Sequence, residues 1–164
     1  MPARKSQPRT PRKTRRSAGL LMFRRCGASL EVFLVHMGGP FWARKDAGAW
    51  SIPKGEYSDG EEPFSAAQRE FHEETGFTPA GNFIPLDDVT QPGGKIVTAW
   101  AFESDADPAQ IRSNTFSMEW PPKSGRMQEF PEVDRAAWFT LQDARSRILL
   151  GQLPFLDRLA SRVS

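Results

Sequence analysis

The feature that most constrains this chain is a segment from Gly55 to Phe77 that is rich in acidic residues and predicts a helix. Pro63 suits the first turn of a helix and Gly76 suits the position after its last turn, so we predict a helix over about 62–75. At about 100° per residue, one stripe of that helix is formed by small and apolar residues, namely Phe64, Ala67, Phe71 and Thr75. We expect this stripe to face a core.

Charge is unbalanced along this segment. From Asp59 to Glu74 there are six acids and one base, Arg69. Two carboxylates about 6 Å apart repel by roughly 3 kcal/mol at an effective dielectric constant near 20. A solvated acidic face is the simpler interpretation, but such a face normally alternates Glu with Lys, which this segment does not. The pattern therefore predicts a site for a hard divalent cation, which carboxylates and phosphate oxygens bind together.

The whole segment resembles the signature of the Nudix hydrolase family and matches it at every fixed position. The matching residues are Gly55, Glu61, Arg69, Glu70, Phe71, Glu73, Glu74, Gly76 and Phe77. The resemblance implies an α/β fold, an α/β/α sandwich with a mixed sheet and a loop–helix–loop box, covering about residues 17–159. It also implies bound Mg²⁺, with Mn²⁺ as a substitute. The expected reaction is hydrolysis of a pyrophosphate bond in a nucleoside diphosphate linked to another group.

Roles for individual residues follow from the same resemblance. Glu70, Glu73 and Glu74 match metal-binding glutamates, and Gly55 matches a glycine whose carbonyl binds metal. Arg69, beside Glu70, can orient carboxylates through a forked hydrogen bond. We therefore expect Glu70, Glu73 and Arg69 to be catalytic, while the choice of general base among the acids stays open.

Residues before the box indicate the substrate. The run from Trp50 to Gly55 resembles the Trp-x-x-Pro-Lys-Gly sequence of diadenosine polyphosphate hydrolases and their relatives. Lys54 can contact a phosphate chain as a flexible point charge, although a loop lysine is often only solvated. Arg44 is a second predicted substrate-binding residue. We expect Trp50 to belong to the core.

One stretch, residues 113–135, is too interrupted for a long element, and we expect it to be a loop at the substrate mouth. It contains three acids, Glu119, Glu129 and Glu132. The resemblance implies a catalytic acid outside the box. Glu129 is the first candidate and Glu119 the second, and the alternative is that all three are surface acids.

Elsewhere the chain alternates strands and helices. We expect strands over 18–25, 30–37, 82–89 and 95–103, and a short one ending at Thr140. Helices are expected over about 141–150 and 154–162. Strands before and after a central helix predict a mixed sheet between helices.

Composition indicates one domain at 17–164. The chain has 164 residues, no apolar run approaching 18 residues and a single cysteine, Cys26, so we expect no membrane segment, no internal disulfide and a cytoplasmic location. Residues 1–16 carry seven Lys and Arg and no acid, which predicts a disordered basic tail. Nucleic-acid binding through residues 4–16 is open but not expected.

Several functions remain at this stage. Hydrolysis of a dinucleoside polyphosphate or a nucleoside triphosphate is favoured by residues 50–55. The alternatives are removal of pyrophosphate from RNA 5′ ends, hydrolysis of a nucleotide sugar or ADP-ribose, and a non-catalytic nucleotide-binding regulator. The sequence leaves the nucleobase, the attacked phosphorus and the oligomeric state undetermined.

Overall fold

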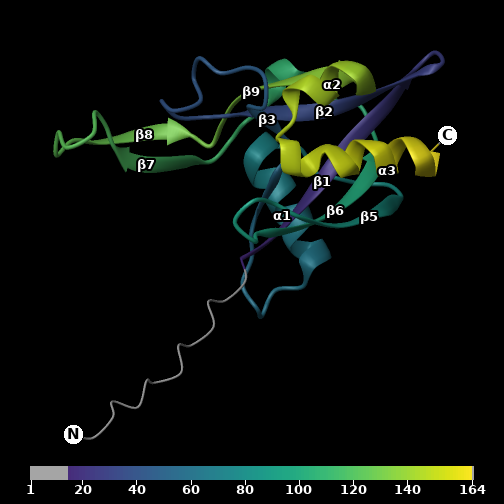
Figure 1. The fold of residues 1–164 in the computed structure, drawn as a ribbon, viewed down its shortest axis with the longest axis horizontal. Helices are drawn as coiled ribbons and strands as arrows, with labels where there is room; N and C mark the ends of the chain where they lie inside the picture. Colours follow the sequence, from purple (N-terminus) through teal and green to yellow (C-terminus); the bar gives the residue numbers. More distant parts are fainter. Residues whose placement is uncertain (1–14, 164) are drawn as a thin grey trace, which may run out of the picture.

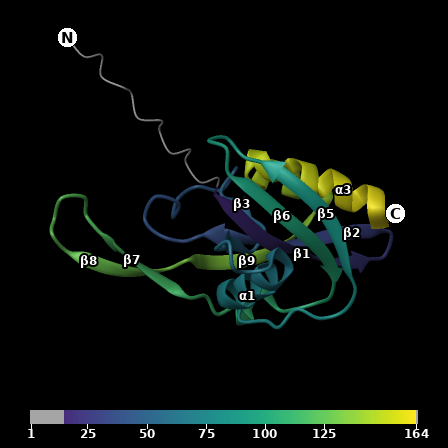
Figure 2. The ribbon, with the colours of Figure 1, turned by 90° about the horizontal axis from the view of Figure 1, so that it is seen from below.

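A computed structural model describes residues 15–163, which form a mixed β-sheet between helices (Figures 1 and 2). The strands are β1 (Arg16–Cys26), β2 (Ser29–Met37), β3 (Trp50–Ser51), β4 (Lys54–Glu56), β5 (Phe83–Thr90), β6 (Ile96–Glu103), β7 (Thr115–Glu119), β8 (Met127–Pro131) and β9 (Val133–Thr140). The helices are α1 (Pro63–Thr75), α2 (Leu141–Arg147) and α3 (Leu153–Val163), with 3₁₀ turns η1 (Pro108–Gln110) and η2 (Leu150–Gln152).

Seven strands within residues 15–163 make the main sheet. The order β3-β2-β1-β6-β5 runs across it, β9 pairs with β2, and only the β1–β6 pair is parallel among these strands. Strands β1 and β2 pair at only four positions near their hairpin, from Phe23 to Cys26. Beyond that point β4 pairs with β1 and β3 pairs with β2, so residues 50–56 lie between the two diverging strands.

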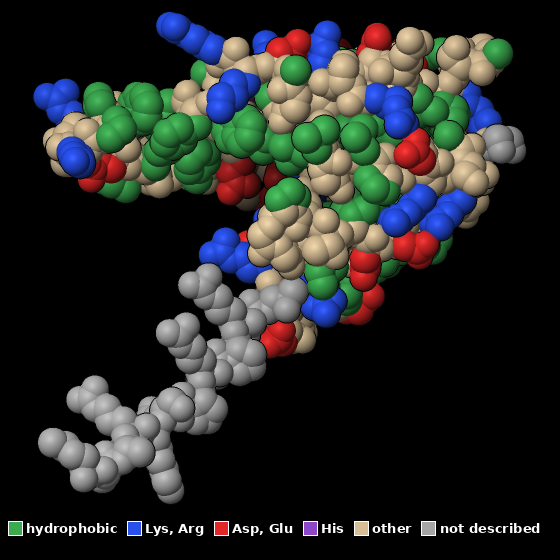
Figure 3. All heavy atoms as spheres, viewed as in Figure 1, with side chains coloured by type: hydrophobic (Ala, Val, Ile, Leu, Met, Phe, Trp, Pro, Cys, Tyr) green, Lys and Arg blue, Asp and Glu red, His purple; other side chains and the backbone are tan. Residues whose placement is uncertain are grey.

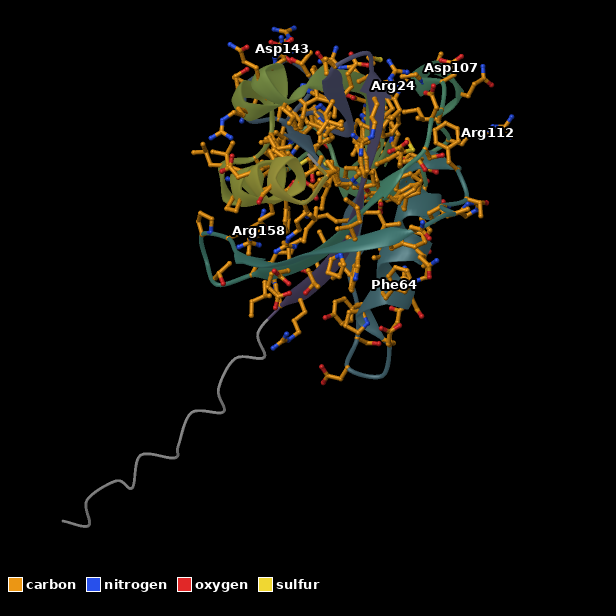
Figure 4. All side chains as sticks on the ribbon, turned by 90° about the vertical axis from the view of Figure 1, so that its right-hand side faces the viewer. Arg24, Phe64, Asp107, Arg112, Asp143 and Arg158 are labelled. Atoms are coloured by element: carbon orange, nitrogen blue, oxygen red, sulfur yellow. The ribbon has the colours of Figure 1, made fainter. Side chains whose placement is uncertain are left out.

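Two hydrophobic cores lie on the two faces of the sheet. Ala18, Leu20 and Met22 of β1 pack on the α1 side, whereas Leu21 and Phe23 pack on the side of α2 and α3. This alternation is expected because successive side chains of a strand point to opposite faces. Figure 4 shows the two helical layers, with Phe64 on the α1 side and Arg158 on the α3 side. The predicted α/β/α sandwich is confirmed.

Helix α1 begins and ends where its sequence signals lie. Glu62 is the N-cap, and its carboxylate accepts hydrogen bonds from the amides of Phe64 and Ser65. Gly76 ends the helix with a φ of 79°, a conformation that glycine adopts without strain. Phe71 is fully buried against Phe102, with ring centroids 5.2 Å apart. Helix α1 is therefore fixed at both ends and along its apolar face, which sets the position of its acidic face.

The segment expected to be a loop is instead a β-hairpin. Strands β7 and β8 pair antiparallel and extend away from the main sheet in both ribbon views (Figures 1 and 2). The sequence signal for this strand is the alternation of Phe116, Met118 and Trp120 with polar residues, which is typical of a half-buried strand. Pro121 and Pro122 lie in the connection between β7 and β8.

Two other boundaries differ from prediction. Arg15 and Arg16 are ordered, because the Arg15 carbonyl accepts from the Ile96 amide and Arg16 begins β1. The rest of the predicted disordered tail, residues 1–14, lies outside the described residues. The helix expected over 141–150 ends at Arg147, since Ile148 leaves it to bridge Trp50. None of the helices formed within residues 15–163 is long and apolar enough to cross a membrane.

Candidate active site

The acidic face of α1 is organised around one arginine. Arg69 donates through Nε and Nη2 to the two carboxylate oxygens of Glu61, at 2.8 and 2.9 Å. Its Nη1 donates to Glu70 at 2.8 Å and to Glu73 at 3.1 Å. The bonds to Glu61 lower the pKa of that carboxyl, and they are the largest cause of the raised pKa of Arg69. Arg69 thus links the loop before α1 to two of the predicted metal ligands, as expected for a residue that orients carboxylates.

The backbone of Gly55 lies directly against the Glu70 carboxyl. A Cβ at position 55 would be 2.0 Å from Glu70 Oε2, a distance that real Cβ atoms essentially never show. Burial of Glu70 raises its pKa, although Arg69 acts in the opposite direction. The structure therefore brings Gly55 and Glu70 together as the sequence indicated, with no room for any side chain between them.

Glu74 and Lys54 form the inner part of the cluster. The Lys54 amide donates to Glu74 Oε2 at 3.1 Å, which ties β4 to the last turn of α1. Glu74 is half-buried at the edge of a pocket, and desolvation raises its pKa to about 8. The pKa of Lys54 is lowered, first by burial and then by the nearby ammonium of Lys95. Both groups are therefore shifted toward their neutral forms.

A pocket of about 250 Å³ opens beside this pair. Its polar part includes Ser51, Lys54, Glu74 and Glu132, and its apolar part includes Met37, Trp42, Phe116 and Val133. Figure 3 shows acidic side chains in the hollow beneath the hairpin and hydrophobic side chains along the hairpin above it. A pocket with an apolar part and a charged part suits a molecule that joins a ring to anionic groups.

An acid outside the box reaches this cluster, and it is Glu132. Its pKa is raised by burial and then by the Glu73 carboxylate, and it also raises the pKa values of Glu70 and Glu74. Glu132 lines the pocket although it is exposed, whereas Glu129, the first sequence candidate, lies on β8 outside the pocket lining and is hydrogen-bonded to Thr115. The structure therefore does not bring Glu129 to the cluster.

Two further sequence candidates also lie apart from the pocket. Glu119 is exposed on β7, and Arg44 is exposed in the 38–49 loop and is not among the pocket-lining residues. The residues of that loop that do line the pocket are Gly38 and Trp42. Trp50 belongs to the core, as expected, and is 4% exposed.

Comparison with known protein families identifies the family to which this cluster of residues belongs. A family model described as NUDIX domain matches residues 13–159, which is most of the chain. The chain belongs to the Nudix family. The box from Gly55 to Phe77, with its helix α1 and flanking loops, is accordingly the Nudix box of this protein.

Two curated relatives have hydrolytic activities in their names. An 8-oxo-(d)GTP phosphatase of Mycolicibacterium smegmatis is 30% identical over 146 residues, which are 82% of this chain and 43% of the relative. An RNA pyrophosphohydrolase of Mesorhizobium japonicum is 31% identical over 109 residues, which are 57% of this chain and 58% of the relative. The chain spans about half the length of these relatives.

Solved Nudix structures share the fold at lower identity. A C. elegans Ap4A hydrolase in a binary complex has a TM-score of 0.62 and 20% identity, covering 90% of this chain and 96% of its own. The NUDIX domain of Shewanella oneidensis NrtR, complexed with ADP ribose, has a TM-score of 0.64 and 16% identity, covering 98% and 95%. These similarities support the sandwich architecture.

Nudix hydrolases generally use divalent metals, and the donor set of this chain fits such an ion. Glu70, Glu73 and Glu74 offer hard carboxylate oxygens, and the missing side chain of Gly55 leaves its backbone against Glu70. Among residues 15–163, however, no group of three or more His, Cys, Asp or Glu side chains is already arranged to hold a metal ion. Arg69 holds Glu70 and Glu73, and Glu74 accepts from Lys54. Each of these bonds uses only one of the two oxygens of its carboxylate, so an ion could bind the other oxygen without breaking the bond.

We predict that Glu74 makes the metal-free protein less stable as pH rises. Its pKa of about 8 in the folded state exceeds the ordinary value of about 4.3. Between these two pH values the folded protein therefore holds a proton on Glu74 that the unfolded protein has lost. The stabilisation is complete below about pH 4.3 and is lost as pH rises through about 8. Melting temperatures with chelator at pH 6 and pH 8.5 should fall with pH, and Glu74→Gln should reduce that fall. An equal fall in Glu74→Gln contradicts the prediction.

Proposed function

We propose that this protein catalyses metal-dependent hydrolysis of a pyrophosphate bond in a nucleotide, with a dinucleoside polyphosphate or a nucleoside triphosphate as substrate. The observation that carries this proposal is a cluster of carboxyls at one end of the pocket: Glu74 and Glu132 line it, and Glu70, which is electrostatically coupled to both, lies against the Gly55 backbone. Such a group binds positive charge strongly, and the same pocket contains Lys54, which can contact phosphate. Family membership supports the same reaction.

The residues that would hold Mg²⁺, or Mn²⁺ in its place, are Glu70, Glu73, Glu74 and the Gly55 carbonyl. When bound, the ion supplies positive charge that neutralises phosphate oxygens and makes phosphorus easier to attack. Lys54 adds a second positive charge for the phosphate chain. The apolar side chains of Trp42 and Phe116 give a nucleobase a surface to stack on.

Glu132 is our candidate for the acid that accepts a proton from the attacking water. It lies at the junction of β8 and β9 and so reaches the cluster from a different part of the chain than α1. Its raised pKa brings it closer to the value of an effective general base at neutral pH. Arg69 would orient Glu70 and Glu73 as metal ligands.

The proposed function is tested by a substrate panel with purified protein and Mg²⁺. The panel contains nucleoside triphosphates including an 8-oxo form, dinucleoside polyphosphates, ADP-ribose, nucleotide sugars and 5′-triphosphorylated RNA, because the relatives named above act on or bind several of these classes. Products are separated by chromatography, and reactions in ¹⁸O-water mark the attacked phosphorus. Hydrolysis that needs the metal and is fastest for triphosphates or dinucleoside polyphosphates supports the proposal. Binding without turnover of any panel member would indicate a regulator instead.

Two matched variants test the acid outside the box. We expect Glu132→Gln to lower kcat by about 100-fold, within the range for loss of a general base, with a smaller change in KM. Glu129→Gln, which removes the same charge from the neighbouring β8 strand, should leave kcat within about twofold. Steady-state kinetics at saturating Mg²⁺ decide the point, and the assignment is wrong if Glu129→Gln has the larger effect.

A further inference from the structure

One buried titratable group lies outside the cluster described so far. His36 of β2 is 0% exposed, and both of its ring nitrogens meet oxygen atoms. Nδ1 is 2.8 Å from Asp134 Oδ1 on β9, and Nε2 is 2.6 Å from the Lys45 carbonyl oxygen in the 38–49 loop. The ring therefore joins a central strand, its neighbour in the sheet and a loop.

These two contacts define the protonation state of the ring. A carbonyl oxygen only accepts hydrogen bonds, so Nε2 must carry a proton. Asp134 is about one-third exposed, which lets water stabilise its ionised form, and a carboxylate also only accepts. Nδ1 must then carry a proton as well. Both contacts are satisfied together when His36 is an imidazolium cation.

Other charged groups around His36 are already paired with different partners. Its ring is packed edge-to-face on Trp50, with centroids 5.1 Å apart. Asp46 accepts from Trp50 Nε1 at 2.9 Å and pairs with Arg147 of α2 at 2.8 Å. Arg135, opposite His36 on β9, has its guanidinium 5.3 Å from the centroid of the Trp50 ring. Asp134 is thus the carboxylate that faces the imidazole directly.

The loop held by His36 forms the aromatic part of the pocket. Trp42 lines the pocket, and the Lys45 ammonium lies 5.1 Å from the centroid of its ring. At its start the loop packs on the hairpin, since Gly39 lies against Phe116 and Phe41 is 5.7 Å from Trp120 between ring centroids. Phe41 is nevertheless 60% exposed. The bond from His36 to the Lys45 carbonyl is therefore an inner anchor for a loop whose outer side faces solvent.

We propose that His36 is a positioning residue, held as an imidazolium between Asp134 and the Lys45 carbonyl, that fixes the 38–49 loop and so places Trp42 in the substrate pocket. The consequence for substrate affinity rests on the proposed function, because it assumes that the pocket binds the nucleotide. The clamp itself does not depend on that assumption.

The first test measures the ring directly by NMR of ¹⁵N-labelled wild-type protein. The chain has two histidines, His36 and His72, so the spectrum of His72→Gln assigns the His36 nitrogens. We expect both His36 nitrogens to show protonated shifts at pH 6. An unprotonated nitrogen in His36 at that pH overturns the proposal, and this result needs neither substrate nor activity.

The second test compares two variants. His36→Gln cannot donate to both acceptors, so we expect faster hydrogen exchange of amides 39–49 and a KM raised about tenfold, with kcat within about twofold. In Asp134→Asn the amide can donate to Nδ1 of a neutral ring while Nε2 still donates to Lys45. That variant should keep KM within about threefold of wild type and keep the slow exchange of amides 39–49.

The outcomes separate the clamp from the proposed function. Faster loop exchange in His36→Gln with no turnover of any substrate by wild-type protein keeps the clamp and rejects the proposed function. Unchanged exchange in His36→Gln rejects the clamp, whatever the activity. A fall in kcat without a change in KM also overturns the proposal, because it would place His36 in the chemical step.

Discussion

Glu70→Gln is expected to lower turnover by at least about a thousandfold, because it removes a carboxylate from the centre of the proposed metal site and a metal supplies several kcal/mol of transition-state stabilisation. Glu70 is the residue where the structural constraints meet. Its carboxyl accepts from Arg69 at 2.8 Å, lies against the Gly55 backbone and is electrostatically coupled to Glu73 and Glu132. An amide keeps the shape of this group but loses the charge that holds a divalent ion.

Folding should survive this substitution. Burial raises the pKa of Glu70, which means that the folded protein already disfavours its charge. A neutral amide of the same size therefore costs little, and the melting temperature without metal should stay within a few degrees of wild type. The change is measured as kcat at saturating Mg²⁺, beside thermal unfolding with and without the metal. Glu119→Gln, which neutralises an exposed glutamate on β7, is the control and should retain activity.

If Glu70→Gln turns over substrate as fast as the wild type, the box has no role in the mechanism. A loss of turnover accompanied by unfolding would instead show that the carboxylate is needed for structure. A retained fold, lost turnover and a lost stabilising effect of Mg²⁺ together support the proposed role.

The box could be predicted from the sequence because its geometry is local. Within one helix, side chains three and four residues apart share a face, so the positions of Arg69, Glu70, Glu73 and Glu74 follow from their spacing. The apolar stripe containing Phe71 fixes which face is buried. Local signals at Pro63 and Gly76 fix the ends of the helix. None of these inferences needs a contact between distant parts of the chain.

Glu132 could not be chosen over Glu129 in the same way, because its position depends on contacts between distant residues. The Gly38 amide donates to the Glu132 carbonyl, and the Glu132 amide donates to the Asn114 carbonyl. The Asn114 amide in turn donates to the Glu73 carbonyl at the end of α1. These bonds join four segments far apart in sequence. The His36 clamp is equally non-local, since residue 36 meets residues 45 and 134.

Gly55→Ala is expected to lower activity about as much as Glu132→Gln. The added Cβ would lie 2.0 Å from Glu70 Oε2 and 2.1 Å from Glu70 Cδ, whereas ordinary contact begins at 3.4 Å. The carboxyl must therefore move by more than 1 Å, away from the position where Arg69 now holds it. A misplacement of about 1 Å can cost about 100-fold in rate, and we expect kcat to fall by that order.

The atoms that an added Cβ would meet distinguish Gly55, a glycine with a proposed role in catalysis, from Gly19, a glycine needed for the fold. At Gly55 the obstacle is the end of a side chain, which can turn aside, so we expect the protein to fold with a stability loss of about 1–3 kcal/mol, the usual cost of overpacking. At Gly19 a Cβ would instead be 2.6 Å from the Pro53 carbonyl oxygen, which is backbone, so Gly19→Ala should destabilise the fold more. Gly60→Ala is the matched control, because a Cβ there meets nothing within 4 Å.

The comparison of these variants also tests why the box begins with glycine. Kinetics and thermal unfolding of the three alanine variants should give low activity with a retained fold for Gly55→Ala alone. If Gly55→Ala retains full activity, the Glu70 carboxyl does not need its present position, and the contact between Gly55 and Glu70 has no role in catalysis. If Gly60→Ala loses as much activity as Gly55→Ala, the effect comes from the stiffness of the loop and not from the clash with Glu70.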